Sequence, residues 1–135
     1  MESLDLSSFE NAIDSLNEVI DVFNSDTSNK ITRDSMIQRF EYTYSIALKM
    51  IKRYFKISAF TFDDIDGMTF NEMIRIANKM GLLKSDLSVW DNYRLKRNMT
   101  SHTYDEKIAK EVVKVIPDFR DEVLFLLNKM KENLS

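Results

Sequence analysis

Apolar residues recur at intervals of three and four along almost the whole chain, a spacing typical of amphipathic α-helices. No segment shows the strict apolar–polar alternation of a half-buried β-strand. The 135 residues include only two glycines and one proline, too few for a hairpin-rich β protein or a glycine-rich phosphate loop. The sequence therefore predicts an all-α protein with a single domain over residues 1–135. We expect an up-down antiparallel bundle of the four-helix type with a short extra helix.

The first two helices are predicted from their apolar stripes and their starts. Ser7 and Glu10 form a capping-box pattern at the start of the first helix, which is predicted to end in the polar run 24–30. The second helix is predicted to begin near Thr32 and to continue to about Lys56. Its apolar stripe consists of Ile37, Phe40, Tyr44, Ala47, Ile51 and Tyr54.

Two shorter helices are predicted next. Thr69 and Glu72 form a second capping-box pattern, and Gly81 is a natural residue to follow the end of that helix. A fourth helix carries Leu87 and Trp90 on its apolar side. Both helices are short, so we expect them to pack onto the long ones.

The last predicted helix is the most regular. Thr103 and Glu106 form a third capping-box pattern, which predicts that the helix begins at Thr103. The apolar positions keep their phase across Pro117, so we expect one long, kinked helix rather than two. Its stripe consists of Ile108, Val112, Val115, Phe119, Val123, Leu126 and Met130.

Charge and composition exclude several classes of function. There are 19 Lys and Arg against 22 Asp and Glu, a net charge of −3, so any contact with nucleic acid needs a local basic patch. The absence of cysteine excludes disulfides and thiol catalysis, and one histidine excludes a three-His zinc site.

The start, Met1-Glu2-Ser3-Leu4-Asp5, is acidic, unlike a signal peptide, and no apolar run reaches the roughly 18 residues of a membrane span. We therefore expect a cytoplasmic protein without membrane contact.

One acidic cluster invites a calcium-loop interpretation. Asp63, Asp64 and Asp66 precede Gly67, as carboxylates precede the invariant glycine of such a loop. That register, however, places apolar residues at the first and last ligand positions. We therefore expect a solvated loop between helices and no metal.

The residues able to carry chemistry are concentrated in 93–105, between the fourth and last helices. Arg97 and His102 are five positions apart, which on a continuous helix would separate their directions by about 140°. A helix end between them would let both side chains turn to one side. Together with Arg94 and Lys96, this is the densest basic cluster near the only histidine. From the residues alone, a histidine that merely caps or hydrogen-bonds at a helix end is an equally good interpretation.

A second basic cluster lies on the second predicted helix. It consists of Lys49, Lys52, Arg53 and Lys56. A charged stripe of this kind is more often a solvated face than a binding face, and the sequence favours the solvated face.

The string Arg97-Asn98-Met99-Thr100-Ser101-His102-Thr103-Tyr104 resembles the R-N-x-x-x-H-x-Y signature of the HEPN superfamily. It is most similar to the branch called nucleotidyltransferase substrate-binding proteins, which are encoded beside a minimal nucleotidyltransferase (MNT). The flanking residues 90–94 and 103–105 and the block 37–44 resemble the same branch. The resemblance extends over roughly residues 6–134.

The resemblance implies a helical bundle that forms a homodimer around the motif and acts as a metal-independent ribonuclease toxin without a cofactor. In that case His102 is the general acid/base, Arg97 holds the phosphate and Asn98 orients one of them, while Arg94 and Lys96 are possible RNA contacts. Cleavage of RNA by its own 2′-hydroxyl needs a base, an acid and a cation. Because one histidine cannot easily supply both proton transfers, a two-fold dimer with two motifs in one cleft suits the chemistry.

The resemblance also implies a partner. A cognate MNT antitoxin would silence the toxin by transferring AMP from ATP to Tyr104, two residues from His102. The competing interpretation is a subunit without catalysis, in which Arg97 and His102 bind a phosphate or nucleotide for the nucleotidyltransferase. A purely structural adaptor is the third interpretation, and it leaves the basic motif unexplained.

Overall fold

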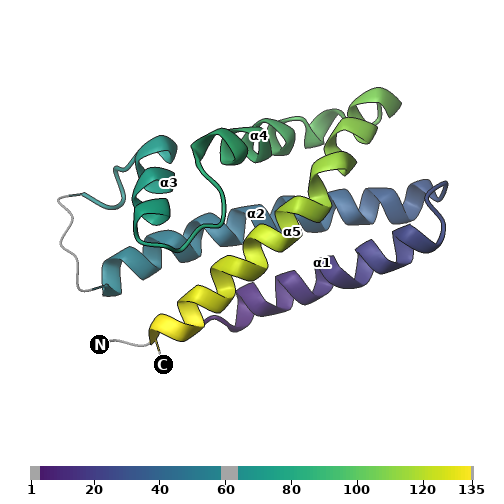
Figure 1. Cartoon of the computed structure of the whole chain (residues 1–135). Coiled ribbons are helices and arrows are strands. Elements are labelled where there is room, and N and C mark those ends of the chain that lie inside the picture. Colours follow the sequence, from purple (N-terminus) through teal and green to yellow (C-terminus); the bar gives the residue numbers. More distant parts are fainter. Residues whose placement is uncertain (1–3, 59–63, 135) are drawn as a thin grey trace.

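The structure is a computed structural model that describes residues 4–58 and 64–134. The predictions that involve Met1, Glu2, Ser3 and Asp63 lie outside the described residues. The described part is helical and contains no strand. The elements are α1 (Ser7–Ser25), α2 (Lys30–Ile57), α3 (Phe70–Lys79), α4 (Leu87–Asn98), the short 3-10 helix η1 (Thr100–His102) and α5 (Glu106–Leu134) (Figure 1).

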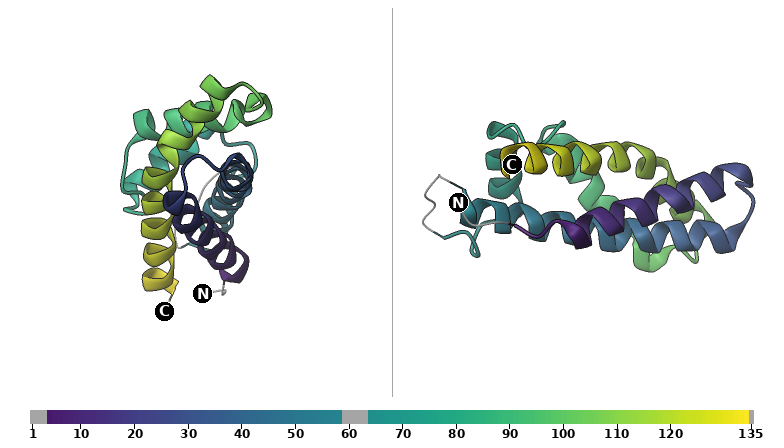
Figure 2. Two further views of the ribbon diagram at one scale, coloured as in Figure 1. Left: turned by 90° about the vertical axis from the view of Figure 1, so that its right-hand side faces the viewer. Right: turned by 90° about the horizontal axis from the view of Figure 1, so that it is seen from below.

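The four main helices α1, α2, α4 and α5 alternate in direction (Figures 1 and 2). An ion pair between Arg33 and Glu106 joins the starts of α2 and α5. Asn133 near the end of α5 donates a hydrogen bond to the Tyr54 hydroxyl near the end of α2, so these two helices are parallel. The predicted up-down bundle is thus confirmed. The extra short helix is α3, which lies in the connection between α2 and α4, across the end of α2 (Figure 1).

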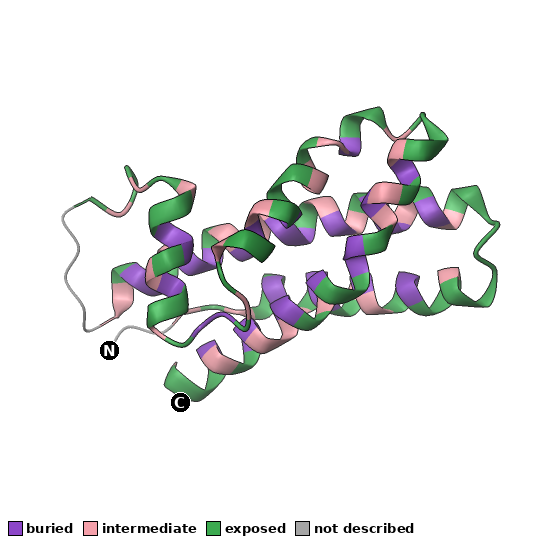
Figure 3. Ribbon diagram, turned by 45° about the horizontal axis from the view of Figure 1, so that its top comes forward, coloured by how far each residue is buried: buried purple, intermediate pink, exposed green. Residues whose placement is uncertain are grey.

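The buried residues form stripes that face the middle of the bundle (Figure 3). All six residues of the stripe predicted for α2 are buried. On α5, Phe119 is fully buried, and its ring packs edge-on against Phe40 of α2 and against Trp90 and Tyr93 of α4. Trp90 and Tyr93 are the buried residues of α4. The aromatic cluster around Phe119 therefore fixes the position of α4, and with it the position of the basic residues at the end of that helix.

Two predicted helix ends are confirmed around α3. The Thr69 hydroxyl oxygen accepts a hydrogen bond from the Glu72 N–H at 3.1 Å, so Thr69 caps the helix as predicted. At the other end Gly81 has φ of +78°, the left-handed conformation that favours glycine after a helix. The Leu82 N–H then bonds to the Ala77 carbonyl, which satisfies a carbonyl at the end of α3.

The predicted capping box at Ser7 is wrong. Ser7 is the first helical residue, and the residue at the N-cap position, Leu6, has no side chain able to cap. The Asp5 carboxylate accepts hydrogen bonds from both the N–H and the hydroxyl of Ser7, at 2.9 and 2.6 Å. A carboxylate two residues upstream thus takes the role that the pattern assigned to Ser7.

The last helix is continuous across Pro117, so the prediction of one long helix is confirmed. It ends beside the start of α1, where Lys131 pairs with Glu10 at 2.9 Å. None of the helices described here combines the length and the apolar character needed to cross a membrane.

Candidate functional site

Residues 93–105, which carry the basic cluster and the histidine, span the end of α4 and the turn that leads to α5. Helix α4 ends at Asn98, η1 spans Thr100–His102, and α5 begins at Glu106. The predicted helix end between Arg97 and His102 is therefore confirmed. The turn lies at the end of the bundle where α1 turns into α2, because Glu106 contacts the first turn of α2 (Figure 1).

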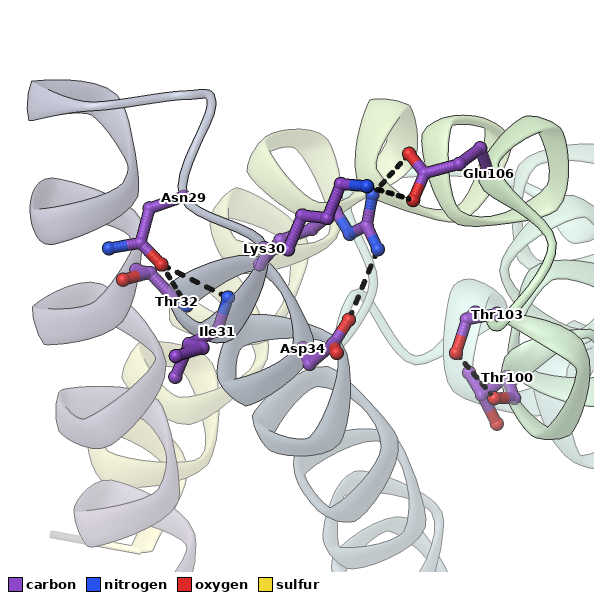
Figure 4. Close-up of polar contacts among 9 residues, drawn as sticks. Asn29, Lys30, Ile31, Thr32, Asp34, Thr100, Thr103 and Glu106 are labelled. Atoms are coloured by element: carbon purple, nitrogen blue, oxygen red, sulfur yellow. Dashed lines mark hydrogen bonds and ion pairs between the residues drawn. The ribbon is translucent and has the colours of Figure 1, made fainter.

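The predicted start of the last helix at Thr103 is wrong by three residues. The Thr103 hydroxyl donates to the Thr100 carbonyl at 3.1 Å instead of capping the helix. Asp105 takes the capping role, since its carboxylate accepts the Lys107 N–H at 2.9 Å. The Glu106 side chain is turned away to α2, so it is not available to complete a capping box (Figure 4).

Glu106 anchors the turn to α2. Its carboxylate lies 2.8 Å from Arg33 Nη1 and 3.3 Å from Lys30 Nζ (Figure 4). The hydrogen bonds from Arg33 and then from Lys30 hold the pKa of the Glu106 carboxyl below its usual value. Because the Arg33 side chain is largely buried, it is a fixed point for the start of α5. Arg33 and Glu106 are 73 positions apart, and no sequence pattern predicted their contact.

Arg97 faces α2 rather than open solvent. Its Nη2 atom lies 3.5 Å from Glu41 Oε1, and about a third of its side chain is exposed. The buried Thr100 hydroxyl lies 3.1 Å from the other oxygen of Glu41 and also 2.8 Å from the Arg97 carbonyl. Glu41 thus holds the guanidinium and the following turn together. The sequence pattern assigned Glu41 no role in this site, because only packing brings α2 beside α4.

His102 has an exposed side chain in the 3-10 helix. Its ring lies 6.3 Å from the Tyr104 ring in an edge-on arrangement. Among the described residues, no hydrogen bond joins His102 to Arg97 or Asn98, and Asn98 is itself exposed. A single chain therefore displays the three predicted catalytic residues near one turn but does not bring their side chains into contact.

Tyr104 is the most exposed large apolar side chain in the part of the chain that the structure describes, at 85%. With Thr103 as the predicted cap, Tyr104 would be the first residue inside the last helix; in the structure it precedes the Asp105 cap and lies outside α5. The N–H of residue 107, which an anion at the helix start would bind, already has Asp105 as its acceptor. The position of Tyr104 thus offers access to a second molecule, and it does not offer an anion-binding helix start.

The two remaining basic residues differ in their surroundings. Arg94 is exposed, pairs with Asp91 at 2.9 Å, and its guanidinium lies 4.5 Å above the centre of the Phe70 ring. The Lys96 side chain is only 15% exposed and lies 3.9 Å from Glu111 of α5. Arg94 therefore remains open to a ligand, whereas Lys96 mainly ties α4 to α5.

Buried Tyr44 lies close to these arginines. Burial raises the pKa of its hydroxyl to about 12, and the positive charges of Arg94 and Arg97 limit that rise.

Within residues 4–58 and 64–134, no three His, Asp or Glu side chains are grouped so that they could hold a metal ion. The candidate site thus combines three cations, each paired with a carboxylate, with an exposed histidine and an exposed tyrosine.

A helical bundle that presents an Arg–His segment in the turn before its last helix is the HEPN-type arrangement that the sequence resemblance predicted. The model of the family described as "Nucleotidyltransferase substrate binding protein like" matches residues 4–132, and the chain belongs to that family.

One relative and two solved structures are similar to the chain. "Probable ribonuclease HepT" from Haemophilus influenzae is 40% identical over an alignment of 111 residues, and the match covers 79% of this chain and 75% of the relative. The H. influenzae protein HI0074, whose structure was described as revealing "the fold of a substrate binding domain of a nucleotidyltransferase", matches with a TM-score of 0.85 and 35% identity. That match covers 94% of this chain and 99% of the other. A Thermus thermophilus protein, ttk003001694, matches with a TM-score of 0.69 and 28% identity, over 90% and 98% of the two chains.

Proposed function

We propose that this protein is a metal-independent endoribonuclease toxin whose active site is completed in a homodimer. The observation that carries the proposal is the exposed His102, which lies five residues after a guanidinium in a chain that is otherwise acidic. The name of the H. influenzae relative, a probable ribonuclease, supports the same activity.

In the proposed reaction the RNA supplies its own nucleophile. The 2′-oxygen attacks the adjacent phosphorus, the P–O2′ bond forms, and the P–O5′ bond breaks to leave a 2′,3′-cyclic phosphate. One His102 takes the proton from the 2′-hydroxyl, and the partner's His102 gives a proton to the departing 5′-oxygen. Arg97 stabilises the charge on the phosphorane-like transition state, and Asn98 orients the phosphate or the imidazole.

Two proton transfers at one phosphate need two groups, and each chain has one histidine. A two-fold dimer that joins the α4–α5 turns would place both copies of His102 in one cleft. The contact between Arg97 and Glu41 is long, at 3.5 Å, and partly exposed, which supports this role for Arg97 because such a pair is weak enough to be exchanged for a phosphate.

A cognate MNT antitoxin would then regulate the site by modifying Tyr104. The phenolic oxygen attacks the α-phosphorus of ATP, the new O–P bond replaces the α–β phosphoanhydride bond, pyrophosphate leaves, and the phenolic proton passes to solvent or to a base of the antitoxin. The 85% exposure of Tyr104 supports access by a second protein. The attached nucleotide would carry bulk and negative charge beside His102, which obstructs RNA.

A second function, a non-catalytic subunit that binds substrate for the nucleotidyltransferase, is favoured by the description of HI0074 and by the family description. In that case Arg97 and His102 bind a phosphate but break no bond. The cell would tolerate the chain when it is expressed alone, whereas a toxin would arrest growth.

RNA cleavage by the purified chain, in the presence of a chelator, tests the proposal. We expect cleavage that leaves 2′,3′-cyclic phosphate ends and that falls by about 10²–10⁴-fold in His102→Ala, with a comparable loss in Arg97→Ala. Neither side chain belongs to the core, so both variants should melt like the wild type. Lys114→Ala, an exposed cation on α5, is the matched control and should cleave normally. Wild-type cleavage rates in His102→Ala would disprove the catalytic assignment.

A further inference from the structure

The exposed face of α2 beside the candidate site carries two neighbouring depressions. The first is lined by Gln38, Glu41, Tyr42 and Ser45, and the second includes Leu48, Lys49 and Lys52 from the same helix. These residues follow one another at steps of one or three along α2, so they share one stripe of its surface. Glu41, the partner of Arg97, lies in this stripe and is about 16 Å along the helix axis from Lys52.

The second depression is an apolar pocket with cationic edges. Met68, Phe70 and Met73, on and just before α3, complete it together with Leu48. Its volume of about 220 Å³ is smaller than the roughly 300–1,000 Å³ typical of small-molecule sites. It therefore suits one flat ring system rather than a whole cofactor.

Arg94 connects this pocket to the candidate active site. Its guanidinium lies over the Phe70 ring, while Arg97 is one helical turn further along α4. An aromatic ring and a guanidinium plane are the two kinds of surface on which proteins stack the bases of single-stranded RNA.

Lys49 and Lys52 line the pocket, whereas Arg53 and Lys56 of the same basic stripe do not. Lys56 is paired with Asp66 at 2.8 Å. In the described part of the chain, neither Lys49 nor Lys52 has a carboxylate within ion-pair distance. The sequence favoured a solvated face for all four cations of this stripe. In the structure Lys49 and Lys52 line a pocket, whereas Arg53 and Lys56 do not.

We propose that this pocket is a subsite for single-stranded RNA, in which one base of the substrate enters between Leu48 and Phe70 and the neighbouring phosphates contact Lys49 and Lys52. The inference rests on the proposed function, because it gives the substrate a second point of attachment about 10–16 Å along α2 from the Arg97–Glu41 contact. The phosphodiester chain between the two points follows the stripe of α2. The subsite selects for unpaired RNA, since a base within a duplex cannot enter a pocket.

RNA binding can be measured apart from cleavage. The protein carries His102→Ala to suppress cleavage, and the probe is a fluorescein-labelled single-stranded RNA of about twelve nucleotides, followed by anisotropy between about 50 and 200 mM salt. The test variant is Lys49→Ala with Lys52→Ala. The matched control is Arg53→Ala with Lys56→Ala, which removes the same charge from the same helix outside the pocket.

We expect the test variant to lose about tenfold in affinity and the slope of log K against log salt to fall by about 1.4, because each phosphate contact contributes about 0.7 on single strands. The control should keep the slope. Phe70→Leu, which retains an apolar side chain but removes the ring, should weaken binding by about fivefold or more. A 4-thiouridine RNA should crosslink to the peptide that contains Phe70.

Equal affinities and slopes for the two double variants would overturn the inference, as would the absence of RNA binding by the His102→Ala protein. If Lys49→Ala with Lys52→Ala instead weakens binding of the purified nucleotidyltransferase or the self-association of the chain, the pocket is a protein interface and the inference is wrong. Binding as predicted by a wild-type chain that never cleaves RNA would refute the proposed function while leaving the subsite intact.

Discussion

Replacing Phe119 by leucine should loosen the attachment of α4 to the bundle. The Phe119 ring lies 4.9 Å from the Phe40 ring and 5.3 Å from the Tyr93 ring, both in edge-on contacts. Each such pair contributes about 0.5–1.5 kcal/mol beyond burial, and leucine leaves little empty volume, so we expect a loss of about 1–3 kcal/mol in the free energy of unfolding. The melting temperature should fall by about 3–6 °C for each kcal/mol.

Trp90 provides a local probe for this change, because it is the single tryptophan and packs 6.2 Å from Phe119. Urea unfolding is followed by Trp90 fluorescence and by far-ultraviolet circular dichroism. In Phe119→Leu we expect the fluorescence transition to precede the loss of helicity, since α4 has few other buried residues. Phe125→Leu, at a half-buried ring on the same helix, is the matched control and should cost less than about 1 kcal/mol. Equal losses in the two variants, with coincident transitions, would refute the argument that Phe119 fixes α4.

Three further predictions concern assembly, modification and the last helix. Sedimentation at micromolar concentration should show a homodimer, and a chain that is only monomeric would exclude a site shared between two copies of His102. Incubation with the cognate nucleotidyltransferase, ATP and magnesium should add AMP to Tyr104 but not to a Tyr104→Phe variant, as measured by intact mass and peptide mapping. An unmodified Tyr104 in protected cells would mean that the antitoxin acts by binding alone. Pro117→Ala should raise the free energy of unfolding by about 1–2 kcal/mol, because alanine restores an N–H inside α5, and a lower melting temperature would contradict this.

The capping-box patterns predicted one helix start correctly and two incorrectly. Thr69 caps α3 as the sequence predicted, but the same pattern failed at Ser7 and Thr103. In both failures an aspartate close in sequence, Asp5 or Asp105, accepts the hydrogen bonds instead. At each start both candidate caps are visible in the sequence. The choice between them depends on the residue at which the chain enters the packed helix.

The apolar periodicity determined the helices, the buried stripes and the continuity of α5 across Pro117, because these depend on residues within one or two turns of each other. The motif likewise located Arg97, His102 and Tyr104 around the junction of α4 and α5. Tertiary structure alone decided that Glu41 holds Arg97 and that Glu106 contacts Arg33. It also decided that Lys49 and Lys52, but not the neighbouring cations Arg53 and Lys56, line a pocket with Phe70. The reason is physical: these contacts join residues on separate helices, and their distances are set by the packing of the bundle around Phe119 rather than by any spacing along the chain.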